Sequence, residues 1–296
     1  MCLNKIALIY KMKNRYLALF IFISFYSCSN KSERIIFSSS RDGNSNIYSM
    51  EADGTDLQPI TSDSTEEWGP SIMPSGEISF LRQTSHTIIR IAIDPASKKD
   101  RYLAHPQNCL LDDKNVLYNQ VNNWQLYACE GTVFVADSMG AIIYQPTQDL
   151  SGKAYKAVWF PDAQKIAFTY KEEGQSDIYT VNLDGAELKN ITNSPYNEEA
   201  PAISPDGTRL LYSTNQDGNN NQEIYLMDLN TGETINMTQT PDWELIARWS
   251  SDGKAVYFGS NKEGNWELYK YELATKKTSR LTNSPSFDGD PRVYSF

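Results

Sequence analysis

The fold is decided by the stretch Lys165–Thr208, which reads KIAFTYKEEGQSDIYTVNLDGAELKNITNSPYNEEAPAISPDGT. It contains short apolar runs that are separated by polar segments rich in Gly, Asp, Asn and Pro. Two of these segments carry Asp-Gly, at Asp184-Gly185 and Asp206-Gly207. Asp-Gly suits tight hairpins because Gly adopts positive φ freely and Asp hydrogen-bonds its own backbone. The stretch therefore predicts one unit of four short antiparallel strands.

The same pattern recurs on both sides of this stretch. Arg209–Lys254 and Ala255–Phe296 repeat it, and so does the segment IIFSSSRDGNSNIYSMEADGTDLQPIT, which begins at Ile35. One position of the third predicted strand recurs after 43, 43, 45, 46 and 44 residues, at Tyr48, Ile91, Phe134, Tyr179, Tyr225 and Tyr269. This period is typical of propeller blades. The sequence predicts an all-β fold, a six-bladed β-propeller of four-stranded antiparallel blades.

Two blades depart from the pattern, and the chain ends indicate how the ring closes. The second blade lacks the Gly-rich loop near Gln83–Ile88, and in the third blade Asn115–Asn119 and Trp124–Cys129 must supply the first two strands. The chain enters on a second strand, Arg34–Ser38, and leaves on a first strand, Asp290–Phe296. We therefore expect the C-terminal strand to join the first blade, which removes an open sheet edge.

The N-terminal segment has the pattern of a secretory signal. Residues 1–27 carry four basic residues and no acid, and the apolar run Tyr16–Tyr26 is too short to span a membrane. Cys28 follows the small residue Ser27, as the lipidated cysteine of a bacterial lipoprotein does. The bulky pair before Ser27 resembles the looser lipobox of Bacteroidetes-type lipoproteins. An ordinary signal peptide with an incidental cysteine is the alternative.

These features predict three segments. Residues 1–27 form a lipoprotein signal peptide, with Met12 as an alternative start, residues 28–33 form a lipidated tether, and residues 34–296 form the propeller. The expected location is the outer membrane, with the protein facing the periplasm or the cell surface. Cys109 and Cys129 could pair in such an oxidising compartment, but their spacing fixes no geometry, so pairing stays open.

The charge of the chain bears on its partners. The formal net charge is −10, and the residues after position 27 contain 23 basic against 37 acidic side chains. This balance argues against nucleic acid, because phosphate binding relies on clustered Lys and Arg. It is compatible with a basic partner or a bound cation, while solubility alone is the plainer explanation.

The repeats resemble those of TolB-type propellers, which are related to WD-repeat propellers. The matching motifs are Ile166-Ala167-Phe168, the run APAISPDG at 200–207, and the path from Ile178-Tyr179 through Asp184-Gly185 to Ile191-Thr192. The resemblance covers about residues 34–296. It implies the propeller fold, and it is compatible with periplasmic envelope scaffolds, propeller domains that gate peptidases and some polysaccharide lyases. Fold likeness alone does not assign an activity.

Acidic residues recur in the loops between blades. Five of six such loops carry an acid three residues before the position of Pro201, namely Glu67, Asp113, Glu198, Glu244 and Asp288. Placed just before the innermost strands, they are expected at one mouth of the central channel, where they could bind a cation or a basic peptide. The alternative is structural, with each carboxylate accepting hydrogen bonds from the backbone or from loop residues such as Arg41.

The same face is expected to carry aromatic residues, Trp68, Tyr196, Trp243 and Phe287. Aromatics beside carboxylates suit sugars or peptide side chains, although packing between blades would use them equally well. Asp42-Asn44-Asn46 and Asp217-Asn219-Asn221-Glu223 alternate like calcium ligands but lack the complete loop pattern, so hairpin turns account for them better. No metal site or cofactor is predicted.

Catalytic motifs are missing from the sequence. His86 and His105 are its two histidines, and neither has metal-ligand spacing; there is no G-x-S-x-G, H-E-x-x-H or P-loop. We expect a non-catalytic, monomeric propeller that binds an envelope protein or glycan through its loop face and is held to the membrane through Cys28. A carbohydrate-active enzyme, or a sensor or regulatory subunit of an envelope complex, remains the alternative. A carboxylate pair with perturbed pKa in a deep pocket would mark the enzyme.

Overall fold

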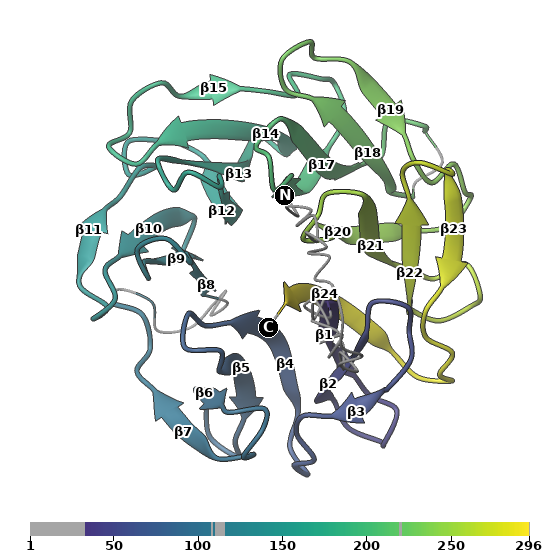
Figure 1. The fold of residues 1–296 in the computed structure, drawn as a ribbon. Helices are drawn as coiled ribbons and strands as arrows, with labels where there is room; N and C mark the ends of the chain where they lie inside the picture. The colour runs from purple at the N-terminus through teal and green to yellow at the C-terminus, as the bar shows by residue number, and fades with distance from the viewer. Residues whose placement is uncertain (1–32, 108, 110–115, 219–220, 296) are drawn as a thin grey trace, which may run out of the picture. The chain divides into compact units, whose positions relative to one another are not determined.

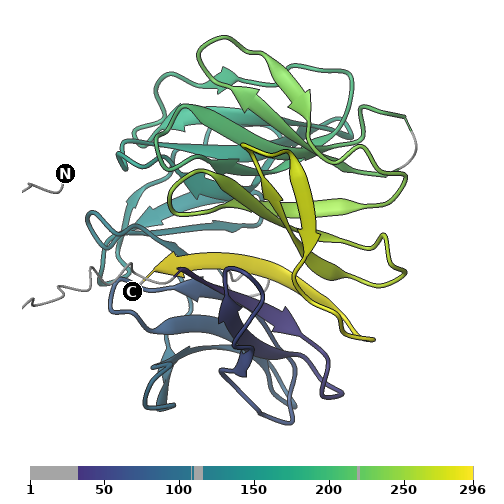
Figure 2. The same cartoon turned by 45° about the vertical axis from the view of Figure 1, so that its right-hand side comes forward.

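The structure is a computed structural model that describes residues 33–107, 109, 116–218 and 221–295. These residues form 24 strands in six four-stranded antiparallel sheets, and no helix is present among them. The sheets are arranged as blades around a central axis (Figure 1), and Figure 2 shows the same ring turned by 45° about the vertical axis. Within the described ranges no helix is long and apolar enough to cross a membrane. The predicted six-bladed propeller is confirmed.

The blades are numbered along the chain, and their strands are given from the axis outward (Figure 1). Blade 1 contains β24 (Asp288–Ser295), β1 (Glu33–Ser39), β2 (Asn46–Glu51) and β3 (Gln58–Pro59). Blade 2 contains β4 (Glu67–Ile72), β5 (Ile78–Gln83), β6 (Ile88–Ile93) and β7 (Asp100–Leu103). Blade 3 contains β8 (Leu117–Tyr118), β9 (Gln125–Cys129), β10 (Thr132–Ala136) and β11 (Ile142–Tyr144).

The second half of the ring follows the same order. Blade 4 contains β12 (Lys153–Trp159), β13 (Lys165–Glu172), β14 (Gln175–Asn182) and β15 (Lys189–Asn190). Blade 5 contains β16 (Glu198–Ile203), β17 (Arg209–Thr214), β18 (Glu223–Asp228) and β19 (Thr234–Asn236). Blade 6 contains β20 (Glu244–Trp249), β21 (Ala255–Ser260), β22 (Glu267–Glu272) and β23 (Lys277–Arg280).

The ring is closed by the last strand, as the sequence predicts. β24 pairs antiparallel with β1, and the register places Ile35 opposite Val293. The outward neighbour β2 pairs with the other edge of β1, so both edges of β1 are occupied. Occupied edges matter because an unpaired edge strand recruits other chains.

Each blade has a pair of facing residues at its centre, buried in every blade except that Tyr179 of blade 4 is half-buried, and this pair explains the period of the sequence. The recurring third-strand residue lies directly opposite the aromatic residue of the second strand, for example Phe37 opposite Tyr48 and Phe258 opposite Tyr269. In the five blades where both members are aromatic, the ring centroids are 5.4 to 6.1 Å apart. Such pairs add about 0.5–1.5 kcal/mol each beyond the area that they bury. Ile91 takes the place of the second aromatic in blade 2.

A threonine after the outermost strand ties that strand back to the third strand. In five blades its Oγ1 accepts a hydrogen bond of 2.8 to 3.1 Å from a third-strand N–H; the five are Thr61, Thr147, Thr192, Thr238 and Thr282. Thr61, Thr147 and Thr282 are buried, and Thr192 and Thr238 are half-buried. Because a buried N–H without a partner costs about 1–3 kcal/mol, this repeated residue helps to fix where each of these five blades ends.

The innermost strands share a bulge that shapes the channel. Two residues after the start of β16 the backbone enters the left-handed region, with φ of 54° at Ala200, and the pairing with β17 shifts at that point. Ile246 in β20 and Asp290 in β24 have φ of 56° and 53°. Residues other than Gly adopt this conformation at a cost of order 1 kcal/mol, so the surrounding ring must hold it. A bulge re-aims the side chains that follow it.

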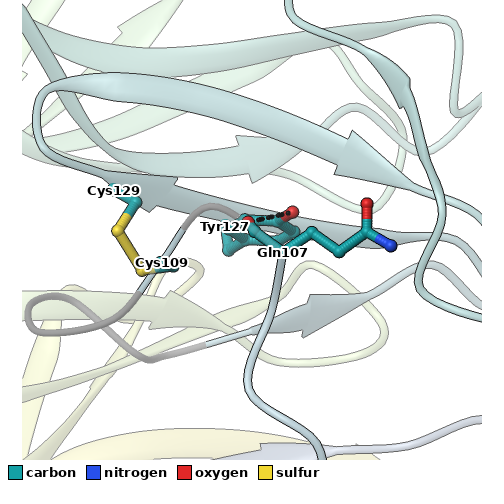
Figure 3. Close-up of a disulfide and its surroundings, with 4 residues drawn as sticks. All are labelled: Gln107, Cys109, Tyr127 and Cys129. Carbon is teal, nitrogen blue, oxygen red and sulfur yellow. Dashed lines mark hydrogen bonds between the residues drawn. A yellow bond between two sulfur atoms is a disulfide. The ribbon is translucent and has the colours of Figure 1, made fainter.

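Blade 3 differs from the others in the way that the sequence suggests. Its innermost strand is only Leu117–Tyr118, shorter than the expected Asn115–Asn119, of which Asn115 lies outside the described residues. A disulfide joins Cys109 to Cys129 at the end of β9, with the Cα atoms 5.5 Å apart (Figure 3). Next to it, the Tyr127 hydroxyl donates a 3.1 Å hydrogen bond to the Gln107 carbonyl. The disulfide thus attaches the preceding connection to the blade with the shortest innermost strand.

Candidate functional site

Four of the five predicted acids lie at one repeated position. Glu67, Glu198, Glu244 and Asp288 are the first residues of β4, β16, β20 and β24. Each is at most 1% exposed. The fifth, Asp113, lies outside the described residues. The four carboxylates are therefore closed off from solvent, whereas a ring of acids open at the channel mouth would be accessible.

The partners of these carboxylates come from the loops and the second strands. Glu198 accepts hydrogen bonds from Ser194 Oγ at 2.5 Å and Thr214 Oγ1 at 3.2 Å. Glu244 is bound in the same way, by Thr240 and Ser260. In the two other blades an arginine takes the place of the hydroxyls, with Arg82 Nε 2.6 Å from Glu67 and Arg41 Nη2 2.7 Å from Asp288. Burial and these contacts favour the structural alternative over a binding role for these four acids.

Burial also changes how these acids titrate. It raises the pKa of Glu198 to about 7 and raises the pKa of Glu67, Glu244 and Asp288 as well. In each of the four, one carboxyl oxygen is buried without a hydrogen-bond partner among the described residues. A carboxylate in that setting is poorly solvated, so the neutral acid is favoured.

Carboxyl groups also approach each other between neighbouring blades. Burial, with help from Glu244, raises the pKa of Glu223 to about 7, and Glu223 accepts hydrogen bonds from Thr238 Oγ1 and from the Thr240 N–H. Paired carboxyls with raised pKa are the feature expected of an enzyme, but only where substrate can reach them. Glu223 and Glu244 are at most 2% exposed, and neither lines the two cavities of the central channel.

Three of the four predicted aromatics are exposed on one face of the ring. Tyr196, Trp243 and Phe287 are 38%, 41% and 41% exposed. They lie in the loops that enter β16, β20 and β24, so they belong to three successive blades. We call these three residues the aromatic face. The fourth, Trp68, is half-buried and lines a channel cavity instead.

Paired hydrogen bonds hold two of these loops in place at the aromatic residue itself. The Trp243 N–H donates to Asn261 Oδ1 at 2.9 Å, and its carbonyl accepts from the Asn261 N–H at 3.2 Å. Phe287 makes the same exchange with Ser40, at 3.1 and 2.9 Å. In the third loop Asn197, next to Tyr196, exchanges hydrogen bonds with Asn215. Backbones fixed in this way present the rings at little entropic cost on binding.

In each segment with alternating Asp and Asn, one asparagine side chain joins its hairpin loop to the loop that leads into the next blade. Asn44 Nδ2 donates to the carbonyls of Asp63 and Thr65 at 2.9 and 2.8 Å, and Asn221 Nδ2 does the same with Thr240 and Asp242. The side-chain amides of Asn44 and Asn221 thus act as hydrogen-bond donors to these loops. In the described part of the chain no three His, Cys, Asp or Glu residues are arranged to hold a metal ion.

The sequence reasoning did not single out two residues of the channel. Arg248 and Arg292 are each the fifth residue of an innermost strand, and both line the cavities of the central channel. The sequence could have indicated these arginines, because each follows the acid of its repeat, Glu244 or Asp288, by four positions. The equivalent positions in β4 and β16 hold the small residues Ser71 and Ala202.

Comparison with known proteins agrees with this architecture. The family model described as the TolB beta propeller domain matches residues 130–295, more than half of the chain. The chain belongs to the TolB β-propeller family. The TolB resemblance of the repeats is thereby confirmed.

Relatives of this TolB-type propeller match parts of longer proteins. It is 24% identical over 185 residues to a protein TolB homolog of Chlorobium luteolum, covering 62% of this chain and 32% of that protein. It is 40% identical over 65 residues to dipeptidyl-peptidase 5 of Porphyromonas gingivalis, covering 22% of this chain and 9% of the peptidase. The TolB-type propeller therefore spans less than a third of the length of each of these relatives.

A solved structure shows the same fold. TolB from Acinetobacter baumannii superposes with a TM-score of 0.72 at 15% identity, covering 89% of this TolB-type propeller and 67% of that chain. At this identity the likeness establishes the fold, and function has to be argued from the site.

Proposed function

We propose that this TolB-type propeller is a non-catalytic protein of the bacterial envelope that binds a partner protein through the aromatic face. The observation that carries the proposal is the presentation of Tyr196, Trp243 and Phe287 on three successive blades, exposed and held by fixed loops. Exposed, rigid aromatics are the residues that most often dominate the free energy of protein binding. Loops on a rigid scaffold are also where binding residues concentrate.

The charge of the protein narrows the kind of partner. The net charge is −10, and the four buried acids behind the aromatic face take part in contacts within the protein. Exposed acids elsewhere on the ring therefore supply most of its negative field, and that field attracts a partner with a basic contact surface.

Export is the second part of the proposal. The disulfide between Cys109 and Cys129 supports it, because such bonds persist in oxidising compartments such as the periplasm. We infer that residues 1–27 are a lipoprotein signal peptide and that Cys28 carries the lipid anchor on the outer membrane. Cys28 lies outside the described residues, so the sequence pattern alone supports the anchor.

The burial of one carboxyl pair away from solvent supports a binding role over catalysis. The pair with raised pKa, Glu223 and Glu244, is buried between blades and does not line the channel cavities. A catalytic carboxyl must come within about 3 Å of its substrate. A role as a sensor or regulatory subunit would use the same aromatic face and differ in what the partner does.

Site-specific photo-crosslinking tests the proposal. A photoreactive amino acid replaces Trp243 in one variant and Tyr102 in a matched control, since Tyr102 is 75% exposed on the outer strand β7. We expect a discrete crosslinked protein from position 243 in whole cells and none from position 102, with Tyr196→Ala and Phe287→Ala each lowering the yield. Equal crosslinking from both positions would refute the aromatic face. Binding of the purified protein to a glycan array that Trp243→Ala abolishes would replace the protein partner with a glycan.

A further inference from the structure

Three successive interfaces between blades each hold a pair of carboxyl groups. One carboxyl lies at or near the start of a third strand, and the other begins the innermost strand of the next blade, which contacts that third strand. The pairs are Asp177 with Glu198, Glu223 with Glu244, and Glu267 with Asp288. All six side chains except the half-buried Asp177 are at most 2% exposed. Two buried carboxylates repel each other unless a positive charge or a shared proton compensates them.

The interface of blades 6 and 1 supplies positive charge to its pair. Arg280 Nη2 lies 2.9 Å from Glu267 Oε1, and Arg41 Nη2 lies 2.7 Å from Asp288 Oδ2. Two guanidinium groups, which stay protonated in proteins, therefore balance two carboxylates. This pair does not depend on a proton for its charge balance.

The other two pairs lack an arginine partner. No Lys or Arg of residues 33–107, 109, 116–218 and 221–295 forms an ion pair with any of their four carboxyls. Asn219 and Asn220, which lie outside the described residues and precede the second pair in the sequence, are uncharged. The other titratable groups that face the two pairs are Asp242, Tyr179, Tyr212, Tyr225 and Tyr269. None of these is a base, so a proton is the counter-charge that remains for each pair.

A threonine joins the two carboxyls between blades 5 and 6. The Thr240 N–H donates to Glu223 Oε1 at 2.9 Å, and the hydroxyl of the same residue donates to Glu244 Oε1 at 2.8 Å. Thr238, in the same loop, also donates to Glu223. Thr240 lies three residues before Trp243, so this carboxyl pair holds the loop that presents the Trp243 ring.

A serine has the same role between blades 4 and 5. The Ser194 N–H donates to Asp177 Oδ1 at 3.2 Å, and its hydroxyl donates to Glu198 Oε1 at 2.5 Å. The Tyr196 N–H in turn donates to Ser194 Oγ at 3.0 Å. The loop of Tyr196 is therefore also held by a carboxyl pair without a cation.

One carboxyl oxygen in each of these two pairs is free to carry the proton. Glu198 Oε2 and Glu244 Oε2 are buried and accept no hydrogen bond within the part of the chain that the structure describes. A proton on such an oxygen makes it a donor to the facing carboxylate. Burial, together with a hydrogen bond with Asp177, raises the pKa of Glu198 to about 7. Burial, together with Glu244, raises the pKa of Glu223 to about 7 as well, so both pairs lose their proton near pH 7.

We propose that the proton shared by each of these two pairs regulates the aromatic face, which binds its partner more tightly at pH 6 than at pH 8. This regulation rests on the proposed function, because it acts on the same binding surface. When the proton leaves, two adjacent carboxylates lie behind each of the loops that carry Tyr196 and Trp243, and their repulsion displaces those loops. The arrangement that presents the rings is the protonated one, so a fall in pH favours it, and a bound partner raises the proton affinity of the pairs.

Fluorine NMR of the purified full chain tests the titration. 4-Fluorophenylalanine replaces Tyr196, Trp243 or Phe287, one position at a time. We expect the fluorine shifts at positions 196 and 243 to change with a midpoint near pH 7. The shift at position 287 should stay constant between pH 6 and pH 8, because arginines balance the pair behind that loop. Shifts that are constant at positions 196 and 243, or that change equally at all three positions, would overturn the proposal.

Glutamine variants assign each titration to its pair. Glu223→Gln should abolish the titration at position 243 and leave that at position 196, and Glu198→Gln should do the reverse. Glu263→Gln is the matched control, because Glu263 is an exposed acid in the loop between β21 and β22 that enters no ion pair or hydrogen bond within the described ranges; it should change neither midpoint. Titrations that persist in both pair variants would refute the assignment. If a glutamine variant does not fold, the comparison of the three fluorinated positions still decides, since it keeps all the carboxyls.

Crosslinking at two pH values tests the effect on the partner. A photoreactive amino acid at position 243 is irradiated in isolated envelopes at pH 6 and at pH 8. We expect a yield of crosslinked partner several-fold higher at pH 6, and a yield independent of pH when Glu223→Gln is added. Equal yields at the two pH values without that substitution would overturn the regulation and leave the aromatic face as a binding surface. A crosslinked protein that is absent at both pH values would overturn the proposed function and, with it, this regulation.

Discussion

Val293 of β24 lies directly opposite Ile35 of β1, so the first and last described strands share one sheet. This pairing predicts a crosslink. Residues that face each other in an antiparallel pair have Cα atoms about 4.5–5.5 Å apart, a separation that a disulfide can bridge. Ile35→Cys with Val293→Cys should form an intramolecular disulfide that changes the mobility of the protein on a non-reducing gel. Phe37→Cys with Val293→Cys is out of register and should stay reduced; equal oxidation of both pairs would contradict the closure.

The buried acid Glu198 predicts how stability depends on pH. Its pKa of about 7 in the folded protein lies above the ordinary value of 4.5 that holds in the unfolded chain. Between these values the folded state keeps a proton that the unfolded state has lost, so raising the pH through this window destabilises the fold. We expect this site to contribute a loss of up to about 3 kcal/mol between pH 4.5 and pH 8.

Glu198→Gln should flatten that dependence, because the amide does not titrate. Urea unfolding at pH 5, 6, 7 and 8 measures the free energy of unfolding for both proteins. Glu233→Gln is the control, since Glu233 is exposed on the outside of blade 5. A slope with pH that Glu198→Gln leaves unchanged would show that Glu198 is ionised throughout.

The disulfide in blade 3 predicts a measurable loss of stability on reduction. Cys109 and Cys129 are 20 residues apart, and closing a loop of this length stabilises a fold by about 3 kcal/mol in the chain-entropy account. The double variant Cys109→Ser and Cys129→Ser should therefore unfold several degrees lower than the unmodified protein. Dithiothreitol should lower the Tm of the unmodified protein toward that of the variant and leave the variant unaffected. A Tm that is insensitive to both changes would contradict a stabilising bond.

Gly289 predicts a way to disturb the aromatic face from beneath. A Cβ atom at Gly289 would overlap the ring of Phe287, so Gly289→Ala must displace that ring. We expect crosslinking of the partner from position 243 to fall several-fold while the far-UV circular dichroism stays the same. Gly259→Ala is the control, because its new Cβ would meet Trp266 at an ordinary 3.5 Å. Equal yields from the two variants would remove Phe287 from the binding surface.

Cys28 predicts lipid attachment. Cells fed a clickable fatty acid should label the unmodified protein, and Cys28→Ala should abolish the label and release the protein from the membrane fraction. Cys2→Ala is a matched control that changes another N-terminal cysteine. Its label should persist, and it should persist also if translation starts at Met12. Labelling that survives Cys28→Ala would disprove the anchor.

The sequence predicts the ring well because each blade repeats the same local chemistry. The centres of the blades follow from pairs such as Phe37 and Tyr48, and their ends follow from Thr238 and its equivalents. These features are local, so their spacing along the chain is enough to count the blades. The closing strand was predictable for a related reason, because β24 supplies the one strand that blade 1 lacks.

The candidate site is harder to predict from the sequence than the ring is, because it depends on contacts between segments that are far apart in the chain. The sequence shows that Glu198 precedes an innermost strand, but its burial follows from Thr214 on the next strand and Ser194 in the loop. Trp68 follows the acid of its repeat, Glu67, whereas Trp243 precedes the equivalent acid, Glu244. Trp68 therefore lies within β4 and lines the channel, whereas Trp243 lies in the loop before β20 and is exposed.

Closure by β24 also sets the order in which the protein can mature. A chain that crosses a membrane from its N-terminus delivers β1 long before residues 288–295 emerge, and until then the inner edge of β1 has no partner. Unpaired edges of this kind aggregate or recruit chaperones. If the protein is exported as proposed above, the time needed to translocate the intervening five blades is the interval during which the unpaired edge of β1 is most exposed, and envelope holdases that shield β1 would act before the ring is complete.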